Sequence, residues 1–259
     1  MFDPKTRKRI PAGMLFAISA LIGAICFIGV YGHRVLDFTN TGWLFDNSHD
    51  LRQHYIAWCR YRSDPWHFPI GLIDSLSYPH SMSVIYTDSI PLFAVIFKLM
   101  SAYLPQDFQY FGLFGIMSFA LMGGFTSILL RRFTDIDGVC IAGSVFYVLS
   151  APVIQRMYYH TALGAQFIIA AALVLWVYDD LIGSDRRRIF YWGLMGFLCV
   201  AIHSSFLPMA GMILAALAVI QIKKKKAALA AGEFAAFSAA GLANLYVLGA
   251  FYGGTDASG

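Results

Sequence analysis

Residues 91–104 have the sequence PLFAVIFKLMSAYL, and the place of this apolar stretch decides how the chain is arranged. The stretch begins at Pro91 and stops before Pro105, and Lys98 lies in its middle. As a helix these residues would extend about 21 Å, whereas the hydrocarbon core of a bilayer is about 30 Å thick. We therefore predict an amphipathic helix that lies in the outer membrane interface and does not cross the bilayer.

The composition of the whole chain is typical of a polytopic membrane protein. Of its 259 residues, 58% are hydrophobic and only 13% are charged, and the mean hydropathy is +0.62. A soluble globule of this size cannot bury so much apolar surface in one core, and 22 Phe, 14 Tyr and 5 Trp exclude a disordered chain. The apolar runs are about 15–25 residues long, which indicates transmembrane helices and excludes an outer-membrane barrel. We predict an all-α transmembrane bundle.

Several functional classes are disfavoured by the polar residues. The formal net charge of +4 comes from short basic clusters between apolar runs, so it does not indicate nucleic-acid binding. The four cysteines show no disulfide or metal spacing, and no Walker loop, GxGxxG or HExxH motif is present. Only the last apolar run contains an internal acid, Glu233, whereas proton-coupled carriers normally have ionisable residues inside the membrane.

The basic clusters predict the topology. They lie in residues 5–9, 131–132, 186–188 and 223–226, and the positive-inside rule places all of them in the cytoplasm. This is satisfied by about seven spans at residues 10–31, 108–130, 138–154, 161–178, 189–203, 206–222 and 227–252, with a cytoplasmic N-terminus. It fails if residues 91–104 cross the membrane, because the last three clusters would then lie outside.

The predicted spans divide the chain into three parts. Residues 1–31 form the cytoplasmic N-terminus and first span, 32–107 form a large outer loop with interfacial helices, and 108–259 form the helical bundle. We expect the chain to be truncated at its C-terminus. All seven histidines fall in the outer loop or at the outer ends of spans. A loop of this length is usually functional or disordered, and its aromatic content argues against disorder.

The densest polar segment of the outer loop is residues 45–69. Asn47 or Ser48 caps a predicted helix that ends near Arg62. On that helix Asp50 and His54 are four residues apart and share a face. A carboxylate beside an imidazole is suited to accept a proton from a hydroxyl group. Two simpler interpretations remain open: Asp50 as a first-turn acid favoured by the helix dipole, and His54 as a hydrogen-bonded interface histidine.

Three further outer positions are candidates. Asp88 is either the N-cap of the interfacial helix or a second acid that faces Asp50 or a bound cation. Arg156 lies four residues before His160 in an outer turn, against the positive-inside trend, so a lipid phosphate gripped by its guanidinium is one explanation and headgroup anchoring is another. Lys98 is either a snorkelling lysine or a phosphate ligand. His203 lies at the next outer turn and could complete the same surface as Arg156 and His160, but we favour a structural role.

The order of these motifs resembles the GT-C superfamily of membrane glycosyltransferases, and within it a group of uncharacterised bacterial members. The resemblance covers nearly the whole chain. It rests on residues 50–54, Trp58, Arg62, residues 66–71, 78–79, 86–92 and 108–113, Arg156, residues 160–163 and 202–203.

The resemblance implies a polyprenyl-phosphate-linked sugar donor bound from the outer face of the bacterial inner membrane. It implies that Asp50, with Asp46 as the nearby rival, is the catalytic base of an inverting displacement. Arg156, with His160 or Lys98, would stabilise the phosphate leaving group. The acceptor is a carbohydrate, lipid or protein of the cell envelope, and no metal or cofactor is expected.

This sequence departs from the family pattern in two ways. Members are usually much longer, and residues 47–49 precede Asp50 where a glycine-containing turn is common. Two other functions are therefore kept as alternatives: a lipid or polysaccharide carrier, and a non-catalytic module of an envelope assembly complex.

Overall fold

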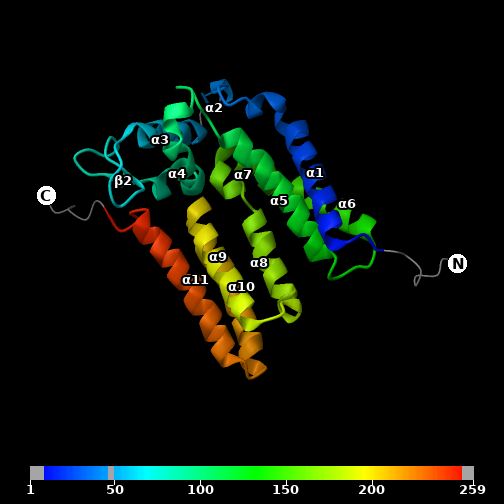
Figure 1. Cartoon of the computed structure of the whole chain (residues 1–259). Coiled ribbons are helices and arrows are strands. Elements are labelled where there is room, and N and C mark those ends of the chain that lie inside the picture. Colours follow the sequence, from blue (N-terminus) through cyan, green and yellow to red (C-terminus); the bar gives the residue numbers. More distant parts are fainter. Residues whose placement is uncertain (1–8, 46–49, 253–259) are drawn as a thin grey trace.

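The computed structural model describes residues 9–45 and 50–252, and most of these residues are helical. Within them the strands are limited to one short antiparallel pair, so the predicted all-α class is confirmed. Long helices pack side by side in a bundle, and short elements form a cap at one end of it (Figure 1). We use the name cap for residues 32–110.

Four helices are long and apolar enough to cross a membrane, which is compatible with a multi-pass membrane protein. They are α1 (Ala12–Tyr31), α5 (Phe111–Leu130), α10 (Phe206–Lys223) and α11 (Ala227–Val247). The other bundle elements are α6 (Asp137–Val148), α7 (Ala151–Tyr159), η5 (Thr161–Gly164), α8 (Phe167–Val177), η6 (Asp179–Leu181) and α9 (Asp185–Ile202). The predicted spans lie over one α-helix each, except residues 138–154, which cover α6 and the start of α7. Helix α8 is only 11 residues long, and α9 begins with charged residues.

The prediction of one helix over 138–154, followed by an outer turn, is wrong in detail. Helix α6 ends at Val148, and α7 starts at Ala151 after a bend of 44°. Pro152 lies in the first turn of α7, where its missing N–H costs no hydrogen bond, so it starts a new helix there. The pair counts as a fifth candidate span if it is one broken helix. Arg156 therefore lies on a helix and not in a turn.

Helices α1 and α5 pack closely because glycines face each other's backbones. A Cβ atom on Gly23 would collide with the backbone of Phe119, and one on Gly123 would collide with the carbonyl of Ser19. Small residues at such contacts allow helix backbones to approach, which is a common basis of helix association in membranes. This contact fixes the end of the bundle from which the chain enters the cap.

The cap consists of short segments that pack on the N-terminal end of α5. Its elements are η2 (His33–Leu36), α2 (Gly42–Phe45), α3 (Leu51–Ser63), β1 (Leu72–Ile73), β2 (Met82–Ser83), η3 (Val84–Thr87), α4 (Pro91–Leu99) and η4 (Ser101–Tyr103). Leu72 pairs with Ser83 and Ile73 with Met82 in the antiparallel ladder. Helix α3 ends at Ser63, as predicted from the following Asp64-Pro65. Its N-cap residue is Asp50, so the prediction that Asn47 or Ser48, which lie outside the described residues, caps this helix is wrong.

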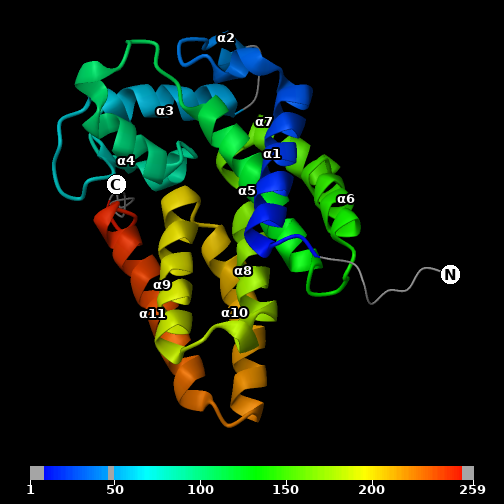
Figure 2. The same cartoon turned by 45° about the vertical axis from the view of Figure 1, so that its right-hand side comes forward.

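The stretch 91–104 is a nine-residue helix followed by a 3-10 turn, so its continuous helical part is even shorter than predicted. Nine residues extend about 14 Å, too little to cross a bilayer. Helix α4 lies beside α3 within the cap, over the end of α9 (Figure 2). The Arg62 guanidinium donates hydrogen bonds to the carbonyls of Ser101, Leu104 and Pro105, and thereby holds the end of this stretch against α3.

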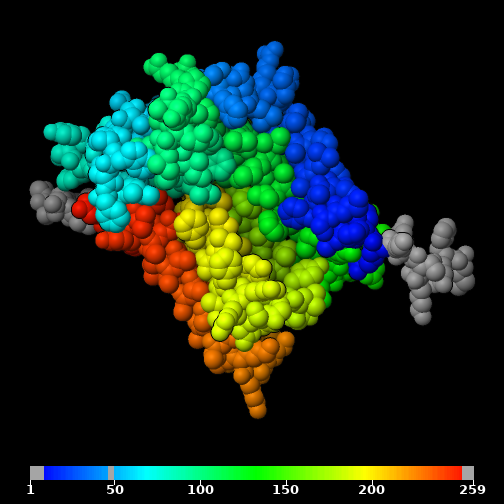
Figure 3. Space-filling view, in the orientation of Figure 1, coloured from blue at the N-terminus to red at the C-terminus, as the bar shows by residue number. Residues whose placement is uncertain are grey.

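The cap also contacts the C-terminal end of α11 (Figure 3). The Ser83 hydroxyl donates to the carbonyl of Leu248, the Tyr86 hydroxyl donates to the carbonyl of Ala250, and the Ile70 amide donates to the carbonyl of Val247. The cap and the C-terminal end of α11, which are far apart in the sequence, therefore meet at the same end of the bundle.

Candidate functional site

Five polar side chains from separate segments meet where the cap joins the bundle. Asp50 and His54 lie at the start of α3, Asp88 follows η3, His160 follows α7 and His203 follows α9. We refer to these five residues as the His–Asp cluster. Four of them were predicted site residues, although residues 50 and 160 are far apart in the sequence.

Asp88 is the centre of the cluster. It follows η3 in the left-handed region, with φ 52° and ψ 18°, and Ile90 is the N-cap of α4, so the N-cap interpretation of Asp88 is wrong. The Nε2 of His203 lies 2.7 Å from Oδ1 of Asp88. The amide of Ser205 donates to Nδ1 of His203 at 3.1 Å, which leaves the proton of the neutral ring on Nε2, the nitrogen that donates to Asp88.

The other oxygen of Asp88 faces two more imidazoles. The Nε2 of His54 and the Nδ1 of His160 each lie 3.5 Å from Oδ2 of Asp88. Burial lowers the pKa of His54 to about 4, which exceeds the opposite effect of the Asp88 charge, so this ring is neutral at pH 7. Burial alone would raise the pKa of Asp88, but the hydrogen bond from His203 and the nearby histidines lower it overall.

Asp50 faces the cluster and does not cap its own helix. It is the N-cap residue of α3, but its carboxylate makes no capping hydrogen bond. Its Oδ2 lies 3.3 Å from Nε2 of His160, and its side chain is 48% exposed. His160 thus lies between two carboxylates, with Nδ1 toward Asp88 and Nε2 toward Asp50. Asp50 precedes the first turn of α3, so the simpler interpretation of Asp50 as a first-turn acid is wrong.

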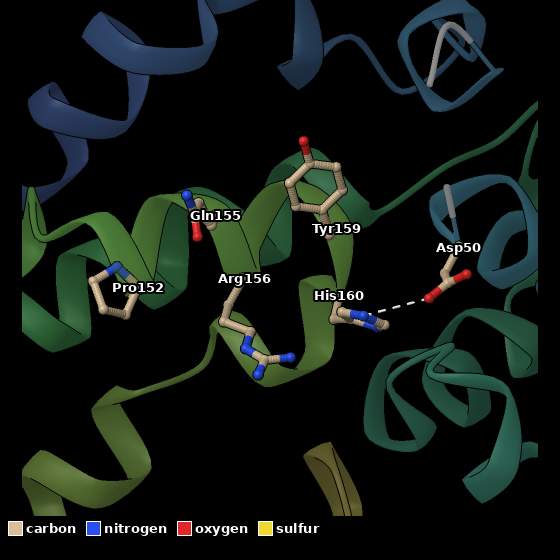
Figure 4. A pocket seen from close by; sticks show the side chains of 6 residues that line it. All are labelled: Asp50, Pro152, Gln155, Arg156, Tyr159 and His160. Atoms are coloured by element: carbon tan, nitrogen blue, oxygen red, sulfur yellow. Dashed lines mark ion pairs between the residues drawn. The ribbon is translucent and has the colours of Figure 1, made fainter. Parts of the chain in front are cut away.

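Asp50 lines two cavities. One, of about 470 Å³, is bounded by Asp50, Pro152, Gln155, Arg156, Tyr159 and His160. Figure 4 shows Arg156 and His160 extending from neighbouring turns, with Asp50 facing His160. The second, of about 560 Å³, lies against His54 and Asp88 and is bounded by the cap residues Leu76, Met82 and Tyr86. A carboxylate that borders two cavities can contact two different molecules at once.

One predicted residue of the described part of the chain, Lys98, is not brought to this site. The Lys98 ammonium lies 4.1 Å from the ring centre of Tyr61 and 4.6 Å from that of Trp66, and the side chain is buried. Lys98 therefore stabilises the packing of α4 through cation–π contacts, and it does not line either cavity beside Asp50. Asp46 lies outside the described residues.

For His203 we favoured a structural role from the sequence, but the structure places it in the His–Asp cluster. The sequence signal for its role is weak: His203 directly precedes Ser204-Ser205 at the end of an apolar run. A backbone N–H that follows a helix end can donate to one ring nitrogen and so fix the tautomer of a histidine. His54, Asp88 and His160 also form a group in which one ligand atom from each lies within 4.8 Å of the others. This group has the residue types that bind a divalent metal.

Comparisons with known proteins identify a family but no activity. A family model described as "Domain of unknown function (DUF6311)" matches residues 20–259. No curated protein and no solved structure matches the chain.

Proposed function

We propose a function from the site itself, because the chain belongs to the DUF6311 family, whose description assigns none. The protein is a membrane glycosyltransferase that transfers a sugar from a polyprenyl-phosphate donor to an acceptor of the cell envelope. One observation carries this proposal: the Asp50 carboxylate borders two cavities, and the Arg156 guanidinium lines one of them. The resemblance of the motif order to GT-C enzymes supports the same assignment.

The chemistry follows from this arrangement. An acceptor hydroxyl in one cavity gives its proton to Asp50 as its oxygen attacks the anomeric carbon of the donor. The bond from that carbon to the phosphate oxygen breaks, and the bonding electrons leave with polyprenyl phosphate. Arg156 stabilises the negative charge that grows on the phosphate. His160 holds the Asp50 carboxylate in place, and the product has the inverted anomeric configuration.

The membrane arrangement is part of the proposal. We place seven spans across the bacterial inner membrane, with the N-terminus in the cytoplasm and the cap on the outer face. Helix α4 then lies along the interface. This placement is supported by the cap, the His–Asp cluster and both cavities, which all lie at one end of the bundle. Arg132 and Lys224, from two of the basic clusters, line another cavity together. They follow α5 and α10, at the opposite end of the bundle from the cap (Figure 1).

Cys59 provides a test of this orientation. It lies in α3 and lines an open cavity with Arg62 and Ser63, so a polar reagent can reach it. We expect a membrane-impermeant maleimide to label Cys59 in intact spheroplasts of a chain whose other three cysteines are serine. Burial raises the pKa of the Cys59 thiol, so labelling is slow and should be followed over time at mildly alkaline pH. Labelling only after permeabilisation would contradict the outer placement of the cap.

The activity itself is tested with purified protein in lipid nanodiscs and a radiolabelled polyprenyl-phospho-sugar. With a bacterial envelope extract as the source of the acceptor hydroxyl, we expect release of polyprenyl phosphate and transfer of the label to the acceptor. We expect Arg156→Ala to raise the donor KM about ten- to a hundredfold, since a hydrogen bond to a charged group is worth about 1.5–3 kcal/mol. Arg34→Ala changes an exposed arginine of the cap that does not line these cavities and serves as the control.

The same assay separates the alternatives. A carrier would move the donor between leaflets without breaking its sugar–phosphate bond, and Arg156→Ala would reduce that flux. A non-catalytic module would show neither consumption nor flux. Either result would overturn the proposed transferase.

A further inference from the structure

The His–Asp cluster has a feature that proton transfer by Asp50 does not require. His54 and His160 approach the same oxygen of Asp88, each at 3.5 Å. A direct hydrogen bond between a nitrogen and a carboxylate is normally about 2.7–3.0 Å long. The three groups therefore surround a common space at a separation longer than strong hydrogen bonding would produce.

This separation matches the geometry of a tetrahedral metal site. With metal–ligand bonds of about 2.0–2.1 Å, adjacent ligand atoms of a tetrahedral zinc site lie about 3.3–3.4 Å apart. The two measured separations of 3.5 Å are close to this value, and one ligand atom from each of the three residues lies within 4.8 Å of the others. Small side-chain shifts would complete the geometry.

Neighbouring residues also orient two of the three candidate ligands. The nitrogen of His160 that points away from Asp88 faces Asp50 at 3.3 Å, and the oxygen of Asp88 that points away from His54 accepts a hydrogen bond from His203 at 2.7 Å. Metal-binding histidines commonly donate their other N–H to a carboxylate, and metal-binding carboxylates are commonly hydrogen-bonded. In this cluster His160 and Asp88, two of the three candidate ligands, are oriented in that manner.

An unpartnered ring nitrogen of His160 is an independent observation in favour of a metal ion. Nδ1 of His160 is buried and has no hydrogen-bond partner among the residues that the structure describes. A buried polar atom without a partner is costly and therefore needs an explanation. A metal ion accepts the lone pair of the His160 nitrogen that faces Asp88.

We propose that His54, Asp88 and His160 bind one divalent transition-metal ion of the zinc class. Two imidazole nitrogens and one carboxylate oxygen form a ligand set that suits such ions better than Mg²⁺ or Ca²⁺. Three protein ligands leave room for a water or phosphate oxygen from the adjoining cavity, which His54 and Asp88 line. The site revises the expectation of no metal that the family resemblance gave. It does not rest on the proposed sugar transfer.

The test measures binding and needs no donor or acceptor. Untagged full-length protein in detergent is stripped with a chelator and then titrated with Zn²⁺ by calorimetry and with Co²⁺ by visible absorption. We expect one ion per chain, and for Co²⁺ the intense bands of a four-coordinate site. His54→Gln and His160→Gln should each weaken the affinity at least a hundredfold. His203→Gln should weaken the affinity about tenfold, because His203 orients the Asp88 carboxylate and does not itself bind the ion.

The matched control is His67→Gln. His67 is a histidine of the same cap whose Nε2 lies 3.0 Å from Asp74, outside the cluster, and its replacement should leave the metal affinity within twofold. Circular dichroism and thermal unfolding of each metal-free variant show whether it is folded. The proposal is overturned if folded wild-type protein binds no stoichiometric metal, or if the folded His54 and His160 variants bind it as tightly as the wild type.

Discussion

Asp50→Asn is expected to reduce sugar transfer about a thousandfold while donor affinity stays within about threefold. General-base catalysis typically contributes about 10²–10⁴ in rate, and an amide cannot take the acceptor proton. Asparagine has nearly the same shape as aspartate, and its amide oxygen can still accept a hydrogen bond from His160, which lies 3.3 Å from Asp50. The lesion therefore falls on the chemical step and not on binding. Single-turnover assays and equilibrium donor binding measure the two quantities separately.

Asp74→Asn is the matched control for this experiment. Asp74 is another carboxylate of the cap that faces a histidine, His67, at 3.0 Å, but it lies outside the cluster. Its replacement should leave transfer within about twofold. If Asp50→Asn keeps more than a tenth of the wild-type rate, the assignment of the base is wrong. Asp46→Asn is then the next variant to measure.

The helical bundle was largely predictable from the sequence because long apolar runs have few alternatives in a membrane protein. Helices α1, α5, α10 and α11 coincide with predicted spans to within a few residues. The division of α6 from α7 was not predicted, since Ser150 is the only polar residue at the break and Leu149 and Ala151 on either side are apolar. Pro152 was the available indication, because proline favours the first turn of a new helix.

The candidate site was predictable in part, for a local reason. The spacing of Asp50 and His54 places them about one helical turn apart, and the predicted topology placed the histidines on one side of the membrane. The cluster lies at one end of the bundle, where the cap joins it. What spacing cannot give is the direction of each side chain across elements. Lys98 illustrates this limit: its ammonium group lies over Tyr61 and Trp66, residues more than thirty positions earlier.

His203 illustrates the same limit in the other direction. Its sequence context, between an apolar helix and two serines, is compatible with a simple helix end. Only the fold brings it within 2.7 Å of Asp88. The local hydrogen bond from the Ser205 amide then fixes the ring so that the proton points at the carboxylate. A residue of this kind acts through its neighbour, so it is found from geometry and not from a motif.

Asp88→Asn should have the second largest effect, a reduction of transfer by about a hundred- to a thousandfold. Asparagine keeps an oxygen that accepts the His203 hydrogen bond, so the cluster stays packed. It removes the negative charge that faces His54 and His160, each at 3.5 Å. The proposed metal ion loses its only charged ligand, so its binding weakens. His160, which holds the Asp50 carboxylate in place, loses its charged partner on the other side, so the transfer rate falls as well. Transfer rate and Co²⁺ absorption should therefore fall together.

The size of the stability change distinguishes two roles for Asp88: positioning the histidines of the cluster, or only holding the cap to the bundle. We expect Asp88→Asn to shift the unfolding temperature of metal-free protein by less than about 4 °C, which corresponds to about 1 kcal/mol in a chain of this size. Asp88→Ala should be less stable by a further ~1–3 kcal/mol, because it leaves the His203 N–H without its acceptor. Asp64→Asn, a cap carboxylate that accepts from the Ser75 amide, is the control. If Asp88→Asn keeps wild-type transfer and metal binding, Asp88 only holds the cap to the bundle.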